Sequence, residues 1–273
     1  MYFHISGTNV RLLGTMHMLP TSAPDLPPWV SDAYEWSQTV VLETDTSTLL
    51  PFFVAPGTST LRKALKPAVW STLESIWPSD GPLSPLVAVH PWAALLLAPS
   101  FCLEVSSGVE PHFTQWATEH SKPIRFLETA KQFAPILETV PKEEVLAGLD
   151  LFASDLEAPQ RSLKQIHTAW LAEDLEGIYL AASLNPTFAY PGLRGAILES
   201  RNRLWAPVIN SMLSTNERTL IAVGALHFYG PDNLFQLLGR GIERIKQLAN
   251  PSIERPRPGK PGRASHVKRR RQS

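Results

Sequence analysis

The stretch at residues 10–17 reads VRLLGTMH, and the stretch at residues 220–227 reads LIAVGALH. Each is a short apolar run that ends in Gly-x-x-His, and such a run predicts a buried strand. His17 and His227 then follow the carboxyl ends of their strands, where open α/β sheets hold their ligands. We therefore expect two histidines that lie 210 positions apart in sequence to meet at one edge of one sheet.

Two further strands are predicted, at residues 39–42 and 123–127, where short apolar runs lie between loops. Between the strands at residues 10–13 and 39–42, residues 25–36 have apolar positions at helical spacing after a Pro-Pro entry. A strand, a helix and a strand in so few residues indicate a crossover connection and a pair of parallel strands.

The remaining pattern is largely helical. Helices are predicted at residues 111–120 and 195–212, and residues 129–184 are helical throughout. We read this last block as a helical insertion over the sheet that covers a pocket, with its apolar faces forming core. The predicted fold class is α/β, with a central mostly parallel or mixed sheet flanked by helices and the insertion before the last core strand.

Composition predicts one globular domain over residues 1–250, with 44% hydrophobic and 18% charged residues in the whole chain. Residues 251–273 hold eight basic side chains and one acidic one, interspersed with proline and glycine, and are expected to be a disordered basic tail. The single cysteine, Cys102, cannot form an internal disulfide. The sequence has no secretory signal and no apolar run of membrane-spanning length, so we expect a cytoplasmic location and no integral membrane segment.

The strand at residues 39–42 runs directly into Glu43, and Asp45 faces the same side of the chain by the two-residue period of a strand. Neutral imidazole and carboxylate are ligands of zinc, manganese and iron sites. The glycine three positions before each histidine permits a close approach of the backbone to a ligand. Glu43, His17 and His227 are therefore candidate metal ligands, whereas Asp45 also suits the N-cap of a following turn. His90, His112, His120 and His167 have no matching partners and are expected to be structural or surface residues, and His4 is expected at the opposite end of the sheet.

The ordered set of motifs resembles the TraB/GumN family over roughly residues 1–245. That family is grouped with the Tiki metalloproteases and, more distantly, with erythromycin esterase and the ChaN haem-binding proteins. The motifs that carry the resemblance are LLGTMH at 12–17, VLETD at 41–45, FLE at 126–128, ESRN at 199–202 and VGALHFYG at 223–230.

The resemblance implies a metal-dependent, hydrolase-like site built from His17, Glu43 and His227. Residues 107–110 resemble the Gly-Val-Asp/Glu turn of the family, and the pair at Arg201 and Asn202 matches the helix before the last motif. On this basis a divalent ion, manganese, cobalt or zinc, would polarise a carbonyl of a peptide or small-molecule substrate and lower the pKa of its bound water.

Within that scheme Glu128 is a candidate base or a supporting acid behind the ligands, and Arg201 is a candidate for stabilising an oxyanion. An alternative without metal makes one histidine the general base for water. A ligand-binding or haem-binding protein is the alternative outside catalysis, because the stretch His227-Phe228-Tyr229 would suit axial ligation beside an aromatic wall. Nucleic-acid binding has only the basic tail to support it.

Overall fold

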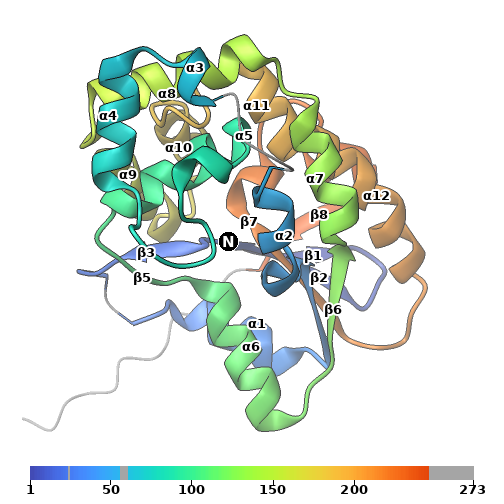
Figure 1. Cartoon of the computed structure of the whole chain (residues 1–273). Coiled ribbons are helices and arrows are strands. Elements are labelled where there is room, and N and C mark those ends of the chain that lie inside the picture. Colours follow the sequence, from blue (N-terminus) through green and yellow to red (C-terminus); the bar gives the residue numbers. More distant parts are fainter. Residues whose placement is uncertain (24, 56–60, 246–273) are drawn as a thin grey trace, which may run out of the picture.

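A six-stranded mixed sheet forms the centre of the protein in the computed structural model, which describes residues 1–23, 25–55 and 61–245 (Figure 1). The strand order is β6-β4-β7-β2-β1-β8. The strands are β1 (Tyr2–Ile5), β2 (Val10–Thr15), β4 (Thr39–Thr44), β6 (Ile124–Glu128), β7 (Thr219–Gly224) and β8 (Ile242–Arg244).

The four predicted strands are confirmed, and they lie side by side as the parallel part of the sheet. β7 pairs in parallel with β2 on one side and with β4 on the other, and β4 pairs in parallel with β6. All six residues of β4 are buried, as expected for a parallel strand that is covered on both faces. The sequence did not predict β1 and β8, which extend the sheet in antiparallel fashion from β2.

The predicted helices are also present. α1 (Pro28–Trp36) begins at the proline pair and connects β2 to β4, and α6 (Val109–His120) precedes β6. The last predicted helix starts as a π-helical turn at Ala196–Ser200 and continues as α12 (Arg201–Met212). A separate two-stranded sheet pairs β3 (Met18–Pro20) with β5 (Val105–Ser107). Two further short helices are α2 (Leu50–Phe53) and α13 (Leu234–Leu238).

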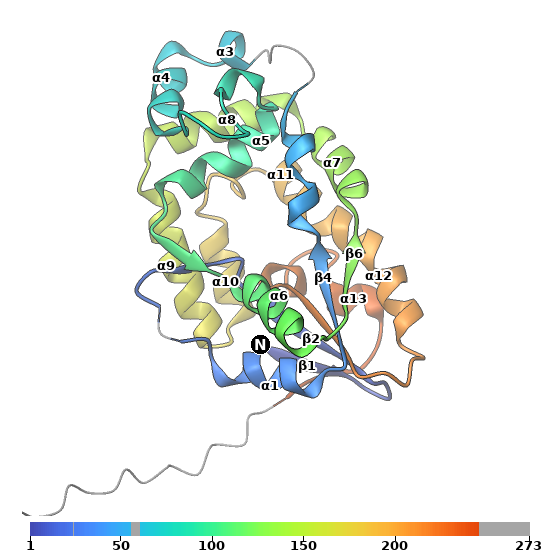
Figure 2. The ribbon, with the colours of Figure 1, turned by 60° about the horizontal axis from the view of Figure 1, so that its bottom comes forward.

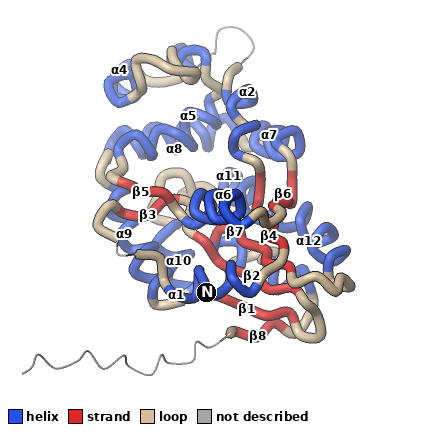
Figure 3. Tube along the Cα trace, turned by 90° about the horizontal axis from the view of Figure 1, so that it is seen from below, coloured by secondary structure: helices blue, strands red, loops and turns tan. Residues whose placement is uncertain are grey.

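The helical layer has its own hydrophobic core. The predicted block contains α7 (Ala130–Glu138), α8 (Lys142–Ser154), α9 (Ala158–Leu171) and α10 (Leu175–Ala182). One buried cluster, which includes Trp70, Trp77 and Trp92, joins α8 to α3 (Leu61–Ala64), α4 (Pro67–Ile76), α5 (Pro91–Leu97) and α11 (Pro191–Gly195). In Figure 3, α4, α5 and α8 lie at the far end of the molecule from β1 and β8, and Figure 2 shows the same three helices away from β1.

The helical block therefore divides between two cores, which refines the expectation of one insertion over the sheet. Leu163 and Trp170 of α9 and Ile178 of α10 belong to the core of the sheet. The Trp170 indole N–H donates to the carbonyl of Gly14 in β2 at 2.8 Å, which fastens α9 to the sheet. Packing by α9 and α10 places their apolar side chains over the edge where the motif histidines lie.

Three other expectations concern membrane-spanning helices, the basic segment and the cysteine. Within the described ranges, no helix is long and apolar enough to cross a membrane. The basic segment 251–273 lies outside the described residues. Cys102 is half-buried and does not form a disulfide.

Candidate active site

The candidate residues lie in a row along the carboxyl edge of the parallel strands. Glu128 is the last residue of β6, Glu43 is the second-last residue of β4, and Gly224 ends β7. His227 lies in the 3-10 turn Ala225–Phe228 that follows β7, and His17 follows β2 by two residues. Because β6, β4, β7 and β2 are neighbours in the sheet, the predicted residues come together from four distant parts of the sequence.

Both motif histidines face the same carboxylate oxygen. The distance from His17 Nε2 to Glu43 Oε1 is 3.6 Å, and that from His227 Nε2 to Glu43 Oε1 is 3.7 Å. The backbone N–H of Gly224 donates to the same oxygen at 2.7 Å. The Glu43 carboxylate is therefore the central group of the site.

His227 is held as a neutral imidazole with its Nε2 lone pair free. Its Nδ1–H donates to Asn202 Oδ1 at 2.7 Å, while the Asn202 amide nitrogen donates to the carbonyl of Asp232 at 3.0 Å. This network assigns the Asn202 oxygen to His227, and so places the ring proton on Nδ1. Burial outweighs Glu43 and lowers the pKa of His227 to about 3.

His17 has the opposite electrostatic setting. Its Nδ1–H donates to Glu110 Oε1 at 3.0 Å, and the same oxygen accepts a hydrogen bond from the hydroxyl of Thr15. The Glu110 carboxylate, with Glu43 adding to it, raises the pKa of His17 to about 9. The protein thus holds one cationic and one neutral histidine against one carboxylate at neutral pH.

The backbone of α6 fixes Glu110 against the His17 loop. The N–H of Val109 donates to the carbonyl of Met16 at 3.0 Å. Gly108 lies so close to this loop that a Cβ there would be 2.2 Å from the Met16 carbonyl oxygen and 2.3 Å from the His17 carbonyl carbon. Only glycine allows this approach, so the turn at residues 107–110 is required to bring Glu110 to His17.

Arg201 joins the two glutamates of the site. Its Nη2 lies 2.8 Å from Glu43 Oε2 and 2.5 Å from Glu128 Oε1, and its Nε donates to the same Glu128 oxygen at 2.8 Å. The Phe133 and Trp205 rings lie 4.5 Å and 4.4 Å from its guanidinium carbon. Burial alone would raise the pKa of the Glu43 carboxyl, but Arg201 and the two histidines outweigh it and hold that pKa far below its usual range.

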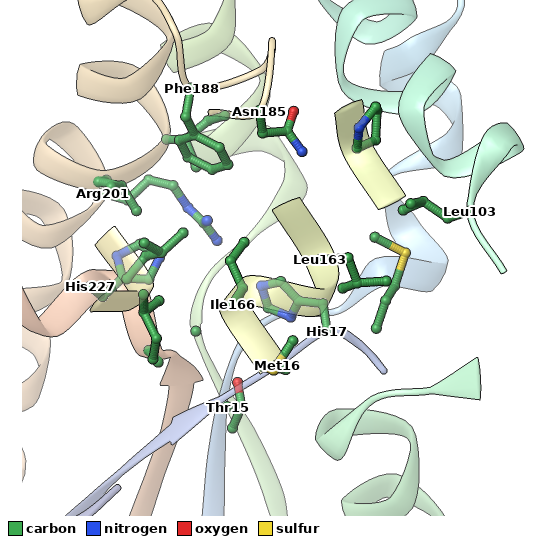
Figure 4. Close-up of a pocket in the computed structure, with 18 residues that line it drawn as sticks. Thr15, Met16, His17, Leu103, Leu163, Ile166, Asn185, Phe188, Arg201 and His227 are labelled. Atoms are coloured by element: carbon green, nitrogen blue, oxygen red, sulfur yellow. The ribbon is translucent and has the colours of Figure 1, made fainter. Parts of the chain in front are cut away.

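A cavity of about 210 Å³ opens beside this cluster. In Figure 4, Arg201 and His227 lie on one side of it and Leu103 lies on the other, with His17 and Ile166 between them. The lining comprises Thr15, Met16, His17, Met18, Leu103, Pro159, Leu163, Ile166, Ile178, Asn185, Phe188, Ile197, Leu198, Arg201, Gly224, Ala225, Leu226 and His227. The polar edge of the cavity thus comes from the strand ends and Arg201, and its apolar wall comes mainly from α9, α10 and residues 185–198.

Gly224 keeps open the space between the three central side chains. A Cβ at Gly224 would lie 3.3 Å from Glu43 Oε1, 3.3 Å from His17 Nε2 and 3.7 Å from His227 Cδ2. The backbone dihedrals at this position, φ −50° and ψ 134°, are open to any residue. The reason for glycine here is therefore the space that the missing side chain leaves.

Two imidazoles and one carboxylate are donor types that divalent ions take. Among the described residues, no group of three or more His, Cys, Asp or Glu side chains forms a ready metal cluster. Two ligands of a tetrahedral zinc ion lie about 3.4 Å apart, and the two histidine-to-Glu43 distances are slightly longer than this. Each histidine also donates its Nδ1–H to a fixed acceptor, as histidines that ligate metals commonly do.

Glu128 is buried behind Arg201 and does not line the cavity. One of its oxygens accepts from Arg201 and from the Thr44 hydroxyl, and the other has no hydrogen-bond partner within the described part of the chain. Glu128 is a candidate base or a supporting acid behind the ligands, and this location favours the supporting role, through Arg201. Arg201 itself lines the cavity, as an oxyanion-binding group must.

Two functional residues received no role from the sequence, although both belong to motifs that it contains. Glu110 orients His17 and Asn202 orients His227. Their signals are the turn at residues 107–110 and the Arg201-Asn202 pair, but only the fold shows which histidine each contacts.

Other candidates lie away from the site. Asp45 caps the turn that follows β4 by accepting from the N–H of Ser47 at 3.1 Å. None of the five remaining histidines lines the cavity. Phe228 packs in the core against Phe3 and Phe235, so it does not form an aromatic wall beside His227.

The TraB/PrgY/gumN family model matches residues 3–242 of the chain. The uncharacterized protein YbaP of Escherichia coli (strain K12) is 26% identical over 235 residues, which cover 84% of this chain and 87% of that protein. The YbaP protein of Shigella flexneri is similar to the same extent. No solved structure matches the chain. Because the matched region spans both histidine motifs and every strand of the parallel sheet, the chain belongs to the TraB/PrgY/gumN family.

Proposed function

We propose that the protein is a metal-dependent hydrolase that cleaves peptide or ester bonds, with its reaction centre between His17, Glu43 and His227. The observation that carries the proposal is the convergence of both histidine Nε2 atoms on one Glu43 oxygen, while a fixed acceptor holds each Nδ1–H. Two imidazoles and a carboxylate beside an open cavity form a ligand set typical of hydrolytic metal centres.

The ion, manganese, cobalt or zinc, would supply Lewis-acid polarisation of the substrate carbonyl and a more acidic bound water. His227 offers its Nε2 lone pair at neutral pH, whereas His17 offers one only after it loses its proton. Arg201 lies at the cavity with its charge fixed by two glutamates, which suits it to stabilise negative charge on the carbonyl oxygen. Glu110, Asn202 and Glu128 hold these three groups in place.

The version without metal uses nearly the same residues. His227 is the better general base in that version, because it is neutral at neutral pH and its Nε2 is free, whereas His17 is protonated. The two versions differ in their dependence on an ion: protein that keeps its activity after complete removal of metal would exclude the first.

The test of the proposal is the substitution Gly224→Ala. It keeps every candidate ligand and the Gly224 N–H bond to Glu43, but its methyl group fills the space between the three side chains. We expect bound metal, measured by elemental analysis after reconstitution with manganese, cobalt or zinc, to fall from stoichiometric to a small fraction. Hydrolysis of a panel of peptides and esters should fall with it.

The matched control is Gly195→Ala, where the added Cβ would meet only the flexible end of Glu199 at 3.3 Å. The double substitution His17→Ala/His227→Ala removes two ligands and should also lose the metal. If wild-type protein binds no metal after reconstitution, or if Gly224→Ala binds it as tightly as wild type, the three-residue metal centre is wrong.

A ligand-binding protein without catalysis is the second candidate, and the mainly apolar wall of the cavity favours it. A haem form of this candidate would show a Soret band in the purified protein. Metal-independent binding of an apolar compound, together with no hydrolysis of any substrate in the panel, would favour this candidate over the hydrolase.

A further inference from the structure

The cavity beside the histidines has one polar edge and one apolar wall. Leu163 and Ile166 from α9, Ile178 from α10, and Phe188 line the wall, and His17, His227 and Arg201 line the edge. An apolar group in this space would lie next to the atoms that the proposed reaction acts on. The wall is therefore placed to select the group attached to the scissile carbonyl.

The size of the cavity limits what enters. Its volume is about 210 Å³, whereas sites for whole drug-sized ligands are about 300–1,000 Å³. A cavity of about 150 Å³ lined by apolar side chains is enough to hold a benzene molecule. The space thus fits one medium-sized apolar group, such as a leucine or phenylalanine side chain or a short acyl chain, and not a whole extended ligand.

Asn185 adds a hydrogen-bond donor to the apolar wall. Its Oδ1 accepts from the backbone N–H of Thr187 at 2.9 Å, which fixes the orientation of the amide. In Figure 4 the oxygen of Asn185 points away from His17 and the nitrogen is on the side of the cavity. An amide nitrogen in this position is able to donate to a carbonyl of a bound compound.

We propose, on the basis of the proposed hydrolase function, that this cavity is the specificity pocket of the enzyme. It binds a bulky apolar side chain or acyl chain attached to the scissile carbonyl, and Asn185 donates to a second carbonyl of the substrate. The substrate class is thus a peptide or acyl ester with a medium-sized apolar group at the cleaved bond, in preference to one with a small or charged group.

Direct binding to metal-free protein, in which the proposed metal-dependent hydrolysis of amides and esters does not occur, tests the pocket apart from turnover. The probes are N-acetyl amides of glycine, alanine, leucine and phenylalanine, and methyl esters of acetic, butyric and hexanoic acids, titrated by ligand-observed NMR. Burial of one large apolar side chain predicts that the leucine probe binds about ten- to a hundredfold tighter than the glycine probe. The tighter series, at equal numbers of apolar carbons, shows whether the apolar group belongs to a peptide or to an acyl ester.

Two substitutions on α9 form a matched pair. Ile166→Phe fills the cavity from a half-buried position, and Leu171→Phe adds the same bulk to a side chain that is 42% exposed and outside the cavity. We expect Ile166→Phe to abolish the preference for leucine over glycine and Leu171→Phe to keep it. Asn185→Asp keeps the Thr187 contact but removes the donor, and should weaken the amide probes.

The outcomes separate the pocket from the reaction. If probe binding depends on the size of the apolar group, Ile166→Phe removes this dependence, and the protein hydrolyses no substrate, the pocket assignment stands and the proposed hydrolase function is wrong. The pocket assignment would be wrong, and the hydrolase function would stand, in either of two cases. In the first, the hydrolysis rate and the probe affinity do not depend on the apolar group. In the second, neither quantity changes in folded Ile166→Phe.

Discussion

His17 and His227 differ in charge because their second nitrogens have different partners. A carboxylate accepts from His17, and it stabilises the imidazolium form. A neutral amide accepts from His227 in a more deeply buried position, and there burial dominates. An ion that binds both histidines must therefore displace one proton from His17 at neutral pH.

The charge of His17 is predicted to depend on Glu110. In metal-free protein the His17 imidazole should titrate near pH 9, and Glu110→Gln should move its pKa down toward the ordinary value of 6.5. The pH dependence of the His17 ring signals in NMR measures this directly. The control is Glu119→Gln on the same helix, which lies outside the site and should leave the titration unchanged. Titration of His17 near 6.5 in wild-type protein would contradict the interpretation.

Asn202 is predicted to control the tautomer of His227. Asn202→Ala removes the acceptor of the Nδ1–H, so we expect metal affinity to fall roughly ten- to a hundredfold. Asn202→Asp retains an acceptor and should restore part of the affinity. Competition with a metal-binding dye measures the effect, and the neighbouring Arg203→Ala, at an exposed side chain that pairs with Asp232, is the control. Equal affinities for the alanine variants at 202 and 203 would disprove this role.

At the scale of elements, α6 and α9 each pack against the β2 strand or the loop that follows it. A glycine lets the first turn of α6 touch the His17 backbone, and one indole hydrogen bond ties α9 to Gly14. Each of these two contacts can be removed by one substitution, which tests its share in positioning the helix.

Gly108→Ala is predicted to displace the start of α6. A Cβ there would overlap backbone atoms of Met16 and His17, which cannot move as a flexible side chain does. We expect a clear loss of thermal stability and a fall in the pKa of His17, because Glu110 moves away from it. Gly195→Ala should instead be neutral or raise stability by about 0.4–1 kcal/mol, since it removes a helical glycine. Unchanged stability and an unchanged His17 titration in Gly108→Ala would show that the contact has no such role.

Trp170→Phe is predicted to loosen α9. The substitution removes the hydrogen bond to the Gly14 carbonyl and should lower the free energy of unfolding by about 1–3 kcal/mol beyond the cost of the smaller ring. Trp92→Phe is the matched control, because Trp92 is also buried but its indole N–H has no hydrogen-bond partner among the described residues. Urea unfolding of both variants measures the difference. Equal losses in the two variants would mean that the hydrogen bond contributes nothing.

At the scale of the whole molecule, the charges of the site make stability depend on pH in both directions. Below pH 6.5 His227 is protonated in the unfolded chain, whereas in the folded protein it stays neutral down to about pH 3. The free energy of unfolding therefore decreases as the pH is lowered through this range. Glu43 adds to the loss below its ordinary pKa of 4.5, because its folded pKa is lower. His17 acts in the other direction: its contribution is complete below pH 6.5 and is lost as the pH rises toward 9.

Thermal unfolding of metal-free protein should therefore give the highest Tm near neutral pH. His227→Gln should flatten the fall in Tm between pH 6.5 and 4.5, and Glu110→Gln should flatten the fall between pH 6.5 and 9. The two variants act on opposite sides of the maximum and serve as controls for each other. Equal flattening on both sides, or none, would show that other groups set the pH dependence.

The parallel strands and the helix between the first two were predictable because each is a local pattern. Residues 10–13, 39–42 and 220–223 are short apolar runs, and the burial of these strands on both faces removes the alternation that exposed strands show. β1 and β8 were not predicted, because they are only four and three residues long, and β8 is stabilised by pairing with β1, which is distant in sequence. Local propensity does not report such pairing.

The sequence by itself determined that His17, Glu43 and His227 lie at the carboxyl edge of one sheet, because parallel strands end at the same edge and each residue follows or ends an apolar run. Only the tertiary structure decided that Glu110 and Asn202 set the two histidines in different charge states, and that α9 and α10 enclose an apolar cavity beside them. The physical reason is that charge and enclosure depend on distances between side chains from separate elements. A residue pattern determines where a strand ends, but the packing of helices on the sheet determines what each strand end faces.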